Sequence, residues 1–239
     1  PMGGIERFSP NGANDVDDAA KEFGTVNFLS TVSQPSLEEV AANSDNPKVF
    51  QIYVRGDNDW IKELVRRVVK AGYSGVTLTV DSAFYGNRER LNPAQLALRR
   101  VAAREWQKKI TWDTVKMIQD EIGDIPFLLK GIMTAEDAAL AVEHGVNGVY
   151  ISNHGGRQLD HVLGNIQTLP EIVEAVDGKA EVFIDGGFTR GTDIVKALAL
   201  GAKAVGIGRL QAWALGAGAA GGVVRCLELL EREIQTTMG

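Results

Sequence analysis

Short apolar segments alternate with amphipathic helical segments along this 239-residue chain, and one kind of junction between them recurs. At each junction a helical segment ends near a glycine and an apolar run begins a few residues later, as in 70–76 (KAGYSGV), 143–149 (EHGVNGV) and 200–205 (LGAKAV). A repeated helix-to-strand unit favours a parallel sheet, because parallel neighbours need a long crossover between them. Two architectures satisfy this pattern: a barrel and an open, doubly wound sheet.

The predicted strands are nearly continuous in apolar residues, as expected of parallel strands covered on both faces. They are 26–30, 49–54, 75–80, 127–130, 148–152, 182–185 and 204–208. Apolar spacing and capping residues predict helices over 60–70, 134–144 and 190–200, and a helix start at Ser36. A stub at Pro1 fits the end of one further strand. We therefore predict an α/β fold, a (β/α)8 TIM barrel with a truncated first strand, as a single domain over residues 1–239.

Composition and charge exclude several classes of protein. Hydrophobic residues make up 44% of the chain and charged residues 23%, which excludes disorder, collagen and coiled coil. The net charge of −6, without a long basic run, argues against nucleic-acid binding. A single cysteine, Cys226, excludes an internal disulfide and a multi-cysteine metal site, and no metal is expected.

The sequence also bears on location. The longest uncharged stretch, 210–224, has 15 residues, fewer than the roughly 20 needed to cross a bilayer. Residues 1–4 lack the basic and apolar regions of a signal peptide. We expect a soluble, cytoplasmic protein without a membrane partner, and a peroxisomal or mitochondrial location stays open for a eukaryotic chain.

Polar residues gather where the predicted strands end, which in a barrel is the face that carries active sites. His154 lies there in a tight polar turn, and Asp81 is suited to orient its imidazole, as a general base requires. The alternative is a purely structural histidine. Lys130 ends an apolar strand, so its ammonium needs an anionic partner, either in a functional site or in a strand-end salt bridge.

The last two predicted strands are each followed by a glycine-rich turn, 185–187 (DGG) and 206–209 (GIGR). Backbone N–H groups of such turns approach anions closely, and the loops after the last two strands are the usual phosphate site of a barrel. Arg190 and Arg209 are placed to add charge-assisted hydrogen bonds. The alternative is that these glycines only form tight turns.

Two further features concern the substrate side of this face. Arg88 and Arg157 are suited to hold a carboxylate between them, although Arg88 stands in a charged run that is also typical of a surface. Segment 91–110 departs from the strand–helix pattern after the run 75–80. It is expected to be a helix inserted in a loop, acting as a lid or lying solvated on the surface.

These residues resemble the FMN-dependent 2-hydroxy acid oxidase and dehydrogenase family, which includes glycolate oxidase, lactate oxidase and flavocytochrome b2. The resemblance is carried, in order, by 51–53 (QIY), 130–132 (KGI), 152–158 (SNHGGRQ) and 185–191 (DGGFTRG). Segment 86–90 (GNRER) is similar to the lactate-oxidase branch in particular. Thr189 departs from the family, which usually has an arginine there, and the family's first strand lies mostly before Pro1.

The resemblance implies FMN as cofactor, a small L-2-hydroxy acid of the lactate or glycolate type as substrate, and a homotetramer. It implies that His154 takes the substrate's hydroxyl proton, that Asp81 stabilises the imidazolium, and that Lys130 lies against the flavin N1–O2 edge. The substrate would be bound by Tyr53, Arg88 and Arg157. FMN would be held by Pro1, Met2, Gly3, Ser30, Gln51, Thr79, Lys130, Ser152, Asp185, Gly186, Gly187, Arg190, Gly208 and Arg209.

Two alternatives stand beside this interpretation. One is a phosphate-binding barrel lyase or isomerase without a redox role, which shares the two glycine-rich turns. The other is a truncated flavin-binding barrel with little activity, suggested by the missing first strand. The electron acceptor is open between oxygen, a quinone and a cytochrome.

Overall fold

The computed structural model of the chain describes residues 1–84, 86 and 104–239. Its strands form one parallel sheet in which each pairs with the next along the chain. They are β1 (Asn27–Ser30), β2 (Lys48–Ile52), β3 (Gly75–Thr79), β4 (Phe127–Ile132), β5 (Gly148–Ile151), β6 (Glu181–Ile184) and β7 (Ala204–Val205). The seven predicted strands are all present. The last is shorter than predicted, ending at Val205 before the turn at Gly206.

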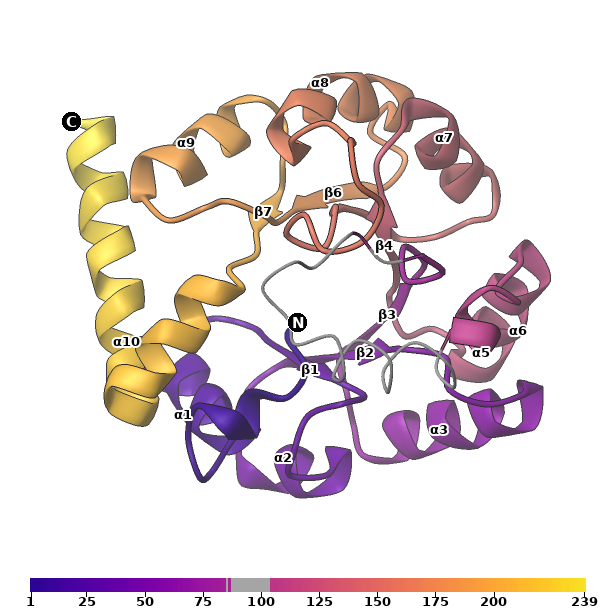
Figure 1. The fold of residues 1–239 in the computed structure, drawn as a ribbon, viewed down its shortest axis with the longest axis horizontal. Helices are drawn as coiled ribbons and strands as arrows, with labels where there is room; N and C mark the ends of the chain where they lie inside the picture. The colour runs from indigo at the N-terminus through magenta and orange to yellow at the C-terminus, as the bar shows by residue number, and fades with distance from the viewer. Residues whose placement is uncertain (85, 87–103) are drawn as a thin grey trace.

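The sheet curls around a central axis, and the helices form a ring outside it (Figure 1). Within the described residues β1 and β7 are the two edges of the sheet and do not pair with each other. The prediction of a truncated (β/α)8 barrel is thereby confirmed. The described helices are η1 (Ile5–Arg7), α1 (Ala13–Phe23), α2 (Leu37–Asn43), α3 (Asn58–Lys70), α5 (Arg104–Gln107), α6 (Trp112–Ile122), α7 (Ala135–Glu143), α8 (Asn165–Val176), α9 (Gly191–Ala199) and α10 (Arg209–Met238).

Side-chain caps fix where several helices begin. The Ser36 hydroxyl accepts from the Glu39 backbone at 3.3 Å, and the Glu39 carboxylate accepts from the Ser36 backbone at 2.9 Å, a capping box that starts α2. Asp57 caps α3 and Thr134 caps α7 in the same manner, each accepting from the backbone three residues later. These caps place the helix starts close to where the sequence predicted them.

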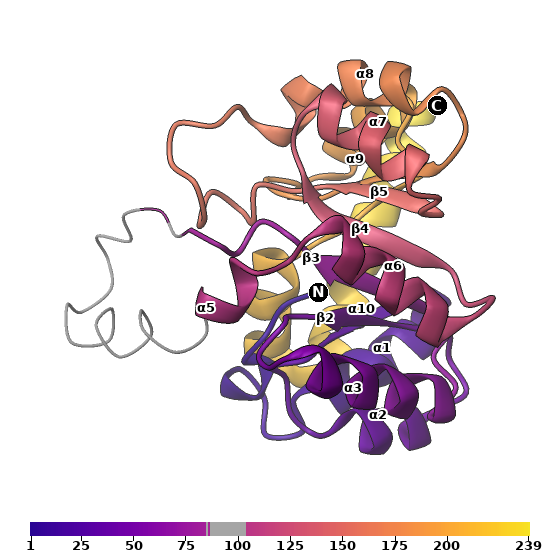
Figure 2. The same cartoon turned by 90° about the vertical axis from the view of Figure 1, so that its right-hand side faces the viewer.

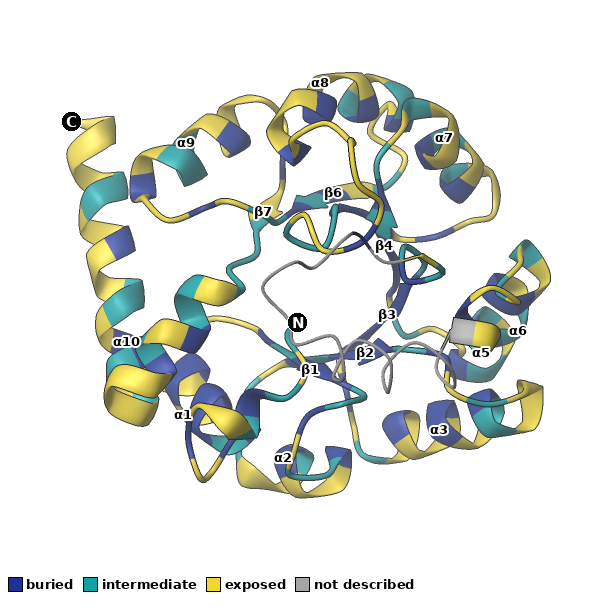
Figure 3. Ribbon diagram, in the orientation of Figure 1, coloured by how far each residue is buried: buried dark blue, intermediate teal, exposed yellow. Residues whose placement is uncertain are grey.

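The strands divide their side chains between two environments, because successive residues point to opposite faces. On the face toward the helices, Phe50, Leu78 and Leu129 are fully or almost fully buried in the apolar core. On the inner face, the alternating residues Gln51 and Lys130 are buried and polar. Figure 3 shows the helices buried on their inward sides and exposed outside. The barrel interior is therefore the place where this fold collects polar groups.

A buried ion pair joins the first elements of the chain. Lys48 Nζ lies 3.3 Å from Asp17 Oδ1, and both side chains are almost fully buried. Lys48 also donates to the Ser44 carbonyl at 2.7 Å, while the second Asp17 oxygen accepts from the Ser44 hydroxyl at 2.7 Å. The pair thus ties α1 to the start of β2.

We expect Lys48→Met to lower the free energy of unfolding by about 3–5 kcal/mol, because it leaves the Asp17 carboxylate buried without a counter-charge. Urea denaturation measures this loss. The matched control is Lys21→Met, which breaks the exposed pair of Lys21 with Asp45 (2.8 Å) and should leave the midpoint unchanged. Equal midpoints for the two variants would contradict a stabilising role of the buried pair.

Helix α10 is longer than the uncharged stretch 210–224, which alone is too short to cross a bilayer. It has 30 residues and, alone among the described helices, is long and apolar enough in composition to cross a membrane. Its backbone leaves helical geometry at Gly218 and Ala219, and its second part carries charged residues, including Arg225 and Glu228. It packs against α1 and α9 (Figures 1 and 2). These features suit an outer helix of the barrel, and the absence of a membrane partner stays a prediction.

The predicted lid lies mostly outside the described residues. Of segment 91–110, the structure describes only 104–110, where α5 occupies Arg104–Gln107 and a turn follows. The described part of the predicted helix is therefore a single turn. Figure 2 shows α5 on the same side of the molecule as the loop between β5 and α8. That side is the carboxyl end of the strands, so the position of α5 agrees with an insertion on the active-site face.

Candidate active site

His154 stands at the centre of a chain of polar contacts beyond the end of β5. Its Nδ1 lies 3.1 and 3.2 Å from the two Asp81 carboxylate oxygens, and its Nε2 lies 2.7 Å from the Tyr53 hydroxyl. An ionised carboxylate can only accept, so in the neutral imidazole Nδ1 carries the proton and Nε2 presents its lone pair to the Tyr53 hydroxyl. The structure thus brings together three predicted site residues, from the loops after β2, β3 and β5.

The turn that carries His154 has an unusual backbone. His154, Gly155 and Gly156 have φ angles of 59°, 66° and 71°, all in the left-handed region. Glycine reaches this region without steric cost, and histidine is among the residues that tolerate it. The His154 N–H donates to the Ser152 hydroxyl at 3.1 Å, and the Gly156 N–H donates to the Asn153 side chain at 3.0 Å. The motif's glycines are therefore needed to turn the chain directly after the histidine.

Lys130 is buried on the inner face of the barrel, 3% exposed. Its Nζ lies 3.0 Å from Asp185 Oδ2, donates to the Ser152 hydroxyl at 2.6 Å, and lies 5.1 Å from the centre of the Tyr150 ring. Burial alone would raise the pKa of Asp185, but the Lys130 ammonium and the Ser152 hydroxyl outweigh burial, and the pKa is lowered. The anionic partner that the sequence required for Lys130 is Asp185.

Three polar side-chain atoms inside the barrel are buried and lack a hydrogen-bond partner among the described residues. They are Gln51 Oε1, Thr77 Oγ1 and Asp185 Oδ1. The Gln51 amide nitrogen is satisfied by the hydroxyl of Thr79, the neighbouring predicted site residue. Buried polar groups are normally paired, so unpaired acceptors beside a buried ammonium indicate a place where a polar ligand binds.

The glycine-rich turns leave open space at the starts of two helices. Gly186 and Gly187 have φ angles of 86° and 91°, and a Cβ at Gly187 or Gly208 would meet no atom within 4 Å. Helices α9 and α10 begin shortly after these turns, so their N-terminal ends point toward the same region. This arrangement suits an anionic group.

The two arginines predicted beside these turns make different contacts. Arg209 donates to the Gly155 carbonyl at 3.1 Å, which links the start of α10 to the His154 turn. Arg190 is exposed and pairs with Glu233 of α10 at 3.1 Å, and the same carboxylate accepts from the Gly191 N–H at 2.7 Å. Arg190 therefore links the start of α9 to α10 through an ion pair. The residues around Arg190 did not predict this pairing.

The remaining predicted residues lie around this face. Gly3 lies against Ser30 at the end of β1, and the Met2 carbonyl accepts from the Ser33 hydroxyl at 3.1 Å. Pro1 is half-buried and lies within electrostatic reach of Lys130. Arg157 is exposed on the loop after β5. Arg88, the other predicted carboxylate ligand, lies outside the described residues.

Sequence reasoning assigned no role to several residues that structure this site. Asn165 accepts from the Asn153 N–H at 3.1 Å and donates to the Asp185 carbonyl at 2.6 Å, joining the loops after β5 and β6. Ser82 and Gln158 join the loops after β3 and β5. Gln158 belongs to the motif 152–158, so its place in the motif was the available signal, whereas nothing local marks Asn165.

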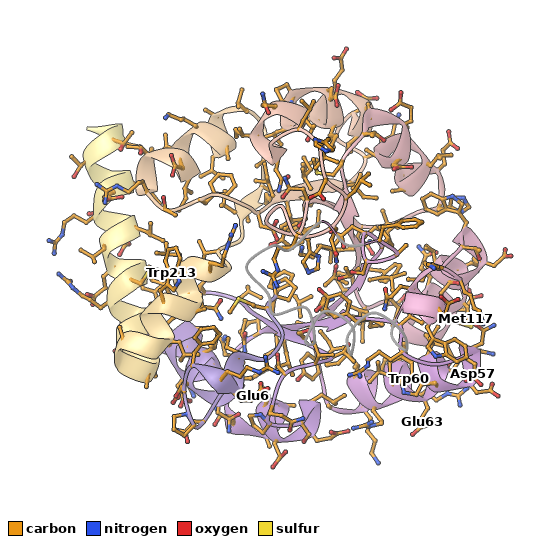
Figure 4. The ribbon with its side chains drawn as sticks, viewed as in Figure 1. Glu6, Asp57, Trp60, Glu63, Met117 and Trp213 are labelled. Carbon is orange, nitrogen blue, oxygen red and sulfur yellow. The ribbon has the colours of Figure 1, made fainter. Side chains whose placement is uncertain are left out.

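One cavity of about 320 Å³ lies at the periphery, away from this cluster. It is lined by the loop after β2 and by α3, α5 and the start of α6, including Asp57, Ile61 and Trp106. Figure 4 shows Asp57 and Trp60 at α3, in the outer part of the molecule near α5 and α6. Neither His154 nor Lys130 lines it, so the chemistry is assigned from the polar cluster and not from cavity size.

The whole chain, residues 1–239, matches the family model described as FMN-dependent dehydrogenase. It is 41% identical to the L-lactate oxidase of Nostoc sp. over 92% of this chain and 68% of that protein. It is 40% identical to the 2-hydroxyacid oxidase of Dictyostelium discoideum over 96% of this chain and 65% of that protein. It is 38% identical to the glycolate oxidase of Spinacia oleracea over 96% of this chain and 69% of that protein. The chain therefore spans about two thirds of the length of these relatives.

Solved structures agree with this match. The crystal structure of mandelate oxidase with (S)-2-phenylpropionate superposes with a TM-score of 0.91 at 41% identity, covering 100% of this chain and 72% of that one. Another crystal structure of mandelate oxidase gives a TM-score of 0.93 at 40% identity with the same coverage. The similarity therefore extends over the whole described barrel.

Proposed function

Because the chain belongs to the family of FMN-dependent dehydrogenases, we propose that it oxidises a small L-2-hydroxy acid, of the lactate or glycolate type, to the 2-oxo acid. The observation that carries the proposal is the Tyr53–His154–Asp81 chain, in which Nε2 of His154 offers a lone pair at the end of the barrel. The relatives named as lactate, glycolate and 2-hydroxyacid oxidases support this substrate class. The non-redox lyase or isomerase receives no support from them.

The residues present fit FMN. The flavin ring carries an imide N–H, which needs an acceptor, and a carbonyl edge that gains negative charge on reduction. Gln51 Oε1 is a buried acceptor without a partner in the described chain, and Lys130 is a buried ammonium. Open glycine turns at the starts of α9 and α10 suit the phosphate. When bound, FMN supplies the acceptor for the two electrons and the C2 hydrogen of the substrate.

The chain's own residues would then transfer the proton, bind the substrate and offset the charge on the cofactor. His154 Nε2 takes the proton of the substrate hydroxyl, and Asp81, hydrogen-bonded to Nδ1, stabilises the imidazolium that forms. Tyr53, whose hydroxyl is 2.7 Å from Nε2, donates to the substrate's oxygen once the substrate displaces this contact. Arg157, together with Arg88, holds the carboxylate. Lys130 offsets negative charge at the cofactor edge.

Anaerobic reduction tests the proposal. The FMN-loaded protein should lose its yellow colour on addition of L-lactate or glycolate without oxygen, and D-lactate should leave the spectrum unchanged. Protein that binds FMN but is bleached by no 2-hydroxy acid would overturn the proposed reaction and favour a flavin-binding barrel with little activity. Protein that binds no FMN would overturn the cofactor assignment as well.

Assembly and location are also proposed and not shown. A homotetramer is supported by the family and by large apolar side chains exposed on the outer helices, such as Trp213 of α10, 62% exposed (Figure 4). Light scattering that gives the mass of one chain would contradict it. A cytoplasmic location is supported by the single cysteine and the acidic charge. The electron acceptor, oxygen or another oxidant, is to be found by reoxidation of the reduced protein.

A further inference from the structure

We propose that Gln158 is a positioning residue for this reaction, because its buried amide clamps together the two loops that carry the catalytic groups. We name residues 80–84 and 86, after β3, the aspartate loop, since they include Asp81. Residues 152–160, after β5, are the histidine loop, since they include His154 and Arg157. The inference rests on the proposed function.

The Gln158 side chain is 3% exposed and faces the aspartate loop. In the orientation that satisfies both ends of the amide, its oxygen accepts from the Ser82 hydroxyl at 3.0 Å. Its nitrogen donates to the carbonyls of Phe84 at 3.1 Å and Arg157 at 3.2 Å. The reverse orientation would set the amide oxygen against two carbonyl oxygens, all acceptors, and is therefore rejected. One amide thus holds both loops.

The two loops also meet backbone to backbone at this point. The Gly86 N–H donates to the Arg157 carbonyl at 3.3 Å. A Cβ at Gly86 would lie 2.4 Å from the Asp160 carboxylate and 2.5 Å from the Gln158 carbonyl, so a larger residue does not fit. The Arg157 carbonyl accepts from both loop contacts, Gly86 and Gln158. The clamp therefore fixes the backbone of the residue predicted to bind the substrate's carboxylate.

On the other side, the clamp fixes the partner of the general base. Ser82, whose hydroxyl donates to Gln158, is the residue directly after Asp81. The Asp81 carboxylate is in turn 3.1 Å from His154 Nδ1. Loss of the amide would leave the Phe84 carbonyl without this partner, and the Ser82 hydroxyl with the Asp81 carboxylate at 3.3 Å. The Arg157 carbonyl would keep the Gly86 N–H as a donor. The two loops would then be held together less firmly. Proton transfer and substrate binding should then weaken together.

The test is anaerobic reduction of FMN-loaded Gln158→Leu by L-lactate. Leucine has a similar volume and no hydrogen-bonding atom. We expect the limiting rate to fall on the order of 10²-fold, the loss typical of a misplacement of about 1 Å, and the half-saturating lactate concentration to rise as well. Ser82→Ala removes one of the three bonds and should shift both quantities in the same direction by less. It also serves if Gln158→Leu fails to fold.

The matched control is Gln167→Leu. Gln167 is exposed, and its amide oxygen accepts from the Gly164 N–H at 2.8 Å, in the same inter-strand connection but away from the aspartate loop. It should react as the wild type does. If Gln158→Leu only lowers the unfolding temperature, while its folded, flavin-loaded fraction keeps wild-type rate and half-saturation, the positioning role is overturned.

Hydrogen exchange separates failure of the clamp from failure of the proposed function. If no 2-hydroxy acid reduces the wild type, the proposed function is wrong, and the clamp is then judged by exchange of the Gly86 amide. We expect this amide to be protected in the wild type and in Gln167→Leu, and to exchange faster in Gln158→Leu. Equal protection in all three proteins would overturn the clamp.

Discussion

Substitution of His154 by asparagine is expected to slow reduction of the bound flavin by L-lactate by a factor of about 10²–10⁴, the usual contribution of a positioned general base. Asparagine is the suitable replacement, because His154 has a φ of 59° and asparagine is among the residues that tolerate the left-handed region. Its amide has no basic lone pair that can take the hydroxyl proton. Stopped-flow absorbance under nitrogen measures the loss as the rate of bleaching.

His161 provides the control for this variant. It lies in the connection that also carries His154, has a φ of 66°, and is exposed. His161→Asn therefore makes the same chemical change at a similar backbone conformation and should leave the bleaching rate unchanged. Both variants should bind FMN as the wild type does, because His154 makes no predicted contact with the cofactor. A rate within a few-fold of wild type for His154→Asn would show that another group takes the proton.

The sequence predicted the parts of this fold that depend on local periodicity and on glycine. Largely apolar strand runs, and helices that end near a glycine, mark several units of the barrel regardless of what packs against them. The motif 152–158 could be located at the carboxyl end of β5 for the same reason. The contact of His154 with Asp81 was predicted from the barrel's geometry, because the ends of parallel strands meet on one face.

Contacts between distant segments were not predictable in this way. Arg190 stands in a motif beside the glycine turn, but its partner, Glu233, comes from the far end of α10. The buried Asp17–Lys48 pair could not be predicted from the residues around either partner, because a lysine at the start of a strand is normally exposed. No helix was predicted over 209–238, because the uncharged stretch 210–224 was compared only with the length of a membrane span. The structure has a 30-residue helix there, with non-helical backbone at Gly218 and Ala219.

Substitution of Lys130 by methionine is expected to lower the free energy of unfolding by about 3–5 kcal/mol near pH 7. Methionine keeps the length and the apolar stem of lysine but removes the ammonium 3.0 Å from Asp185. The carboxylate is then left buried without a counter-charge, and its desolvation is no longer compensated. Urea denaturation of the flavin-free protein measures the loss, and titration with FMN should show weaker binding.

The pH dependence of this loss identifies its cause. In the wild type the pKa of Asp185 is lower in the folded than in the unfolded protein. The ionised carboxylate therefore stabilises the folded state at pH values above the unfolded pKa. This stabilisation is lost as the pH falls through the folded pKa. In Lys130→Met, burial, the largest influence on the Asp185 pKa, is no longer opposed by the ammonium, so we expect this pKa to rise and the stability to be lost as pH rises above the unfolded value. The stability gap between the two proteins should therefore be widest near pH 7 and narrow toward the ordinary aspartate value of 3.8.

The double variant Lys130→Met/Asp185→Asn decides whether the pair itself is responsible. It removes both charges and keeps both side-chain volumes, so it should recover most of the stability lost in Lys130→Met at pH 7. The difference in stability between the wild type and the double variant should not narrow as the pH falls from 7 to 4. FMN binding should stay weak, because both residues belong to the predicted cofactor site. A double variant no more stable than Lys130→Met, or a gap that is the same at pH 4 and pH 7, would mean that the ammonium stabilises the barrel through contacts other than Asp185.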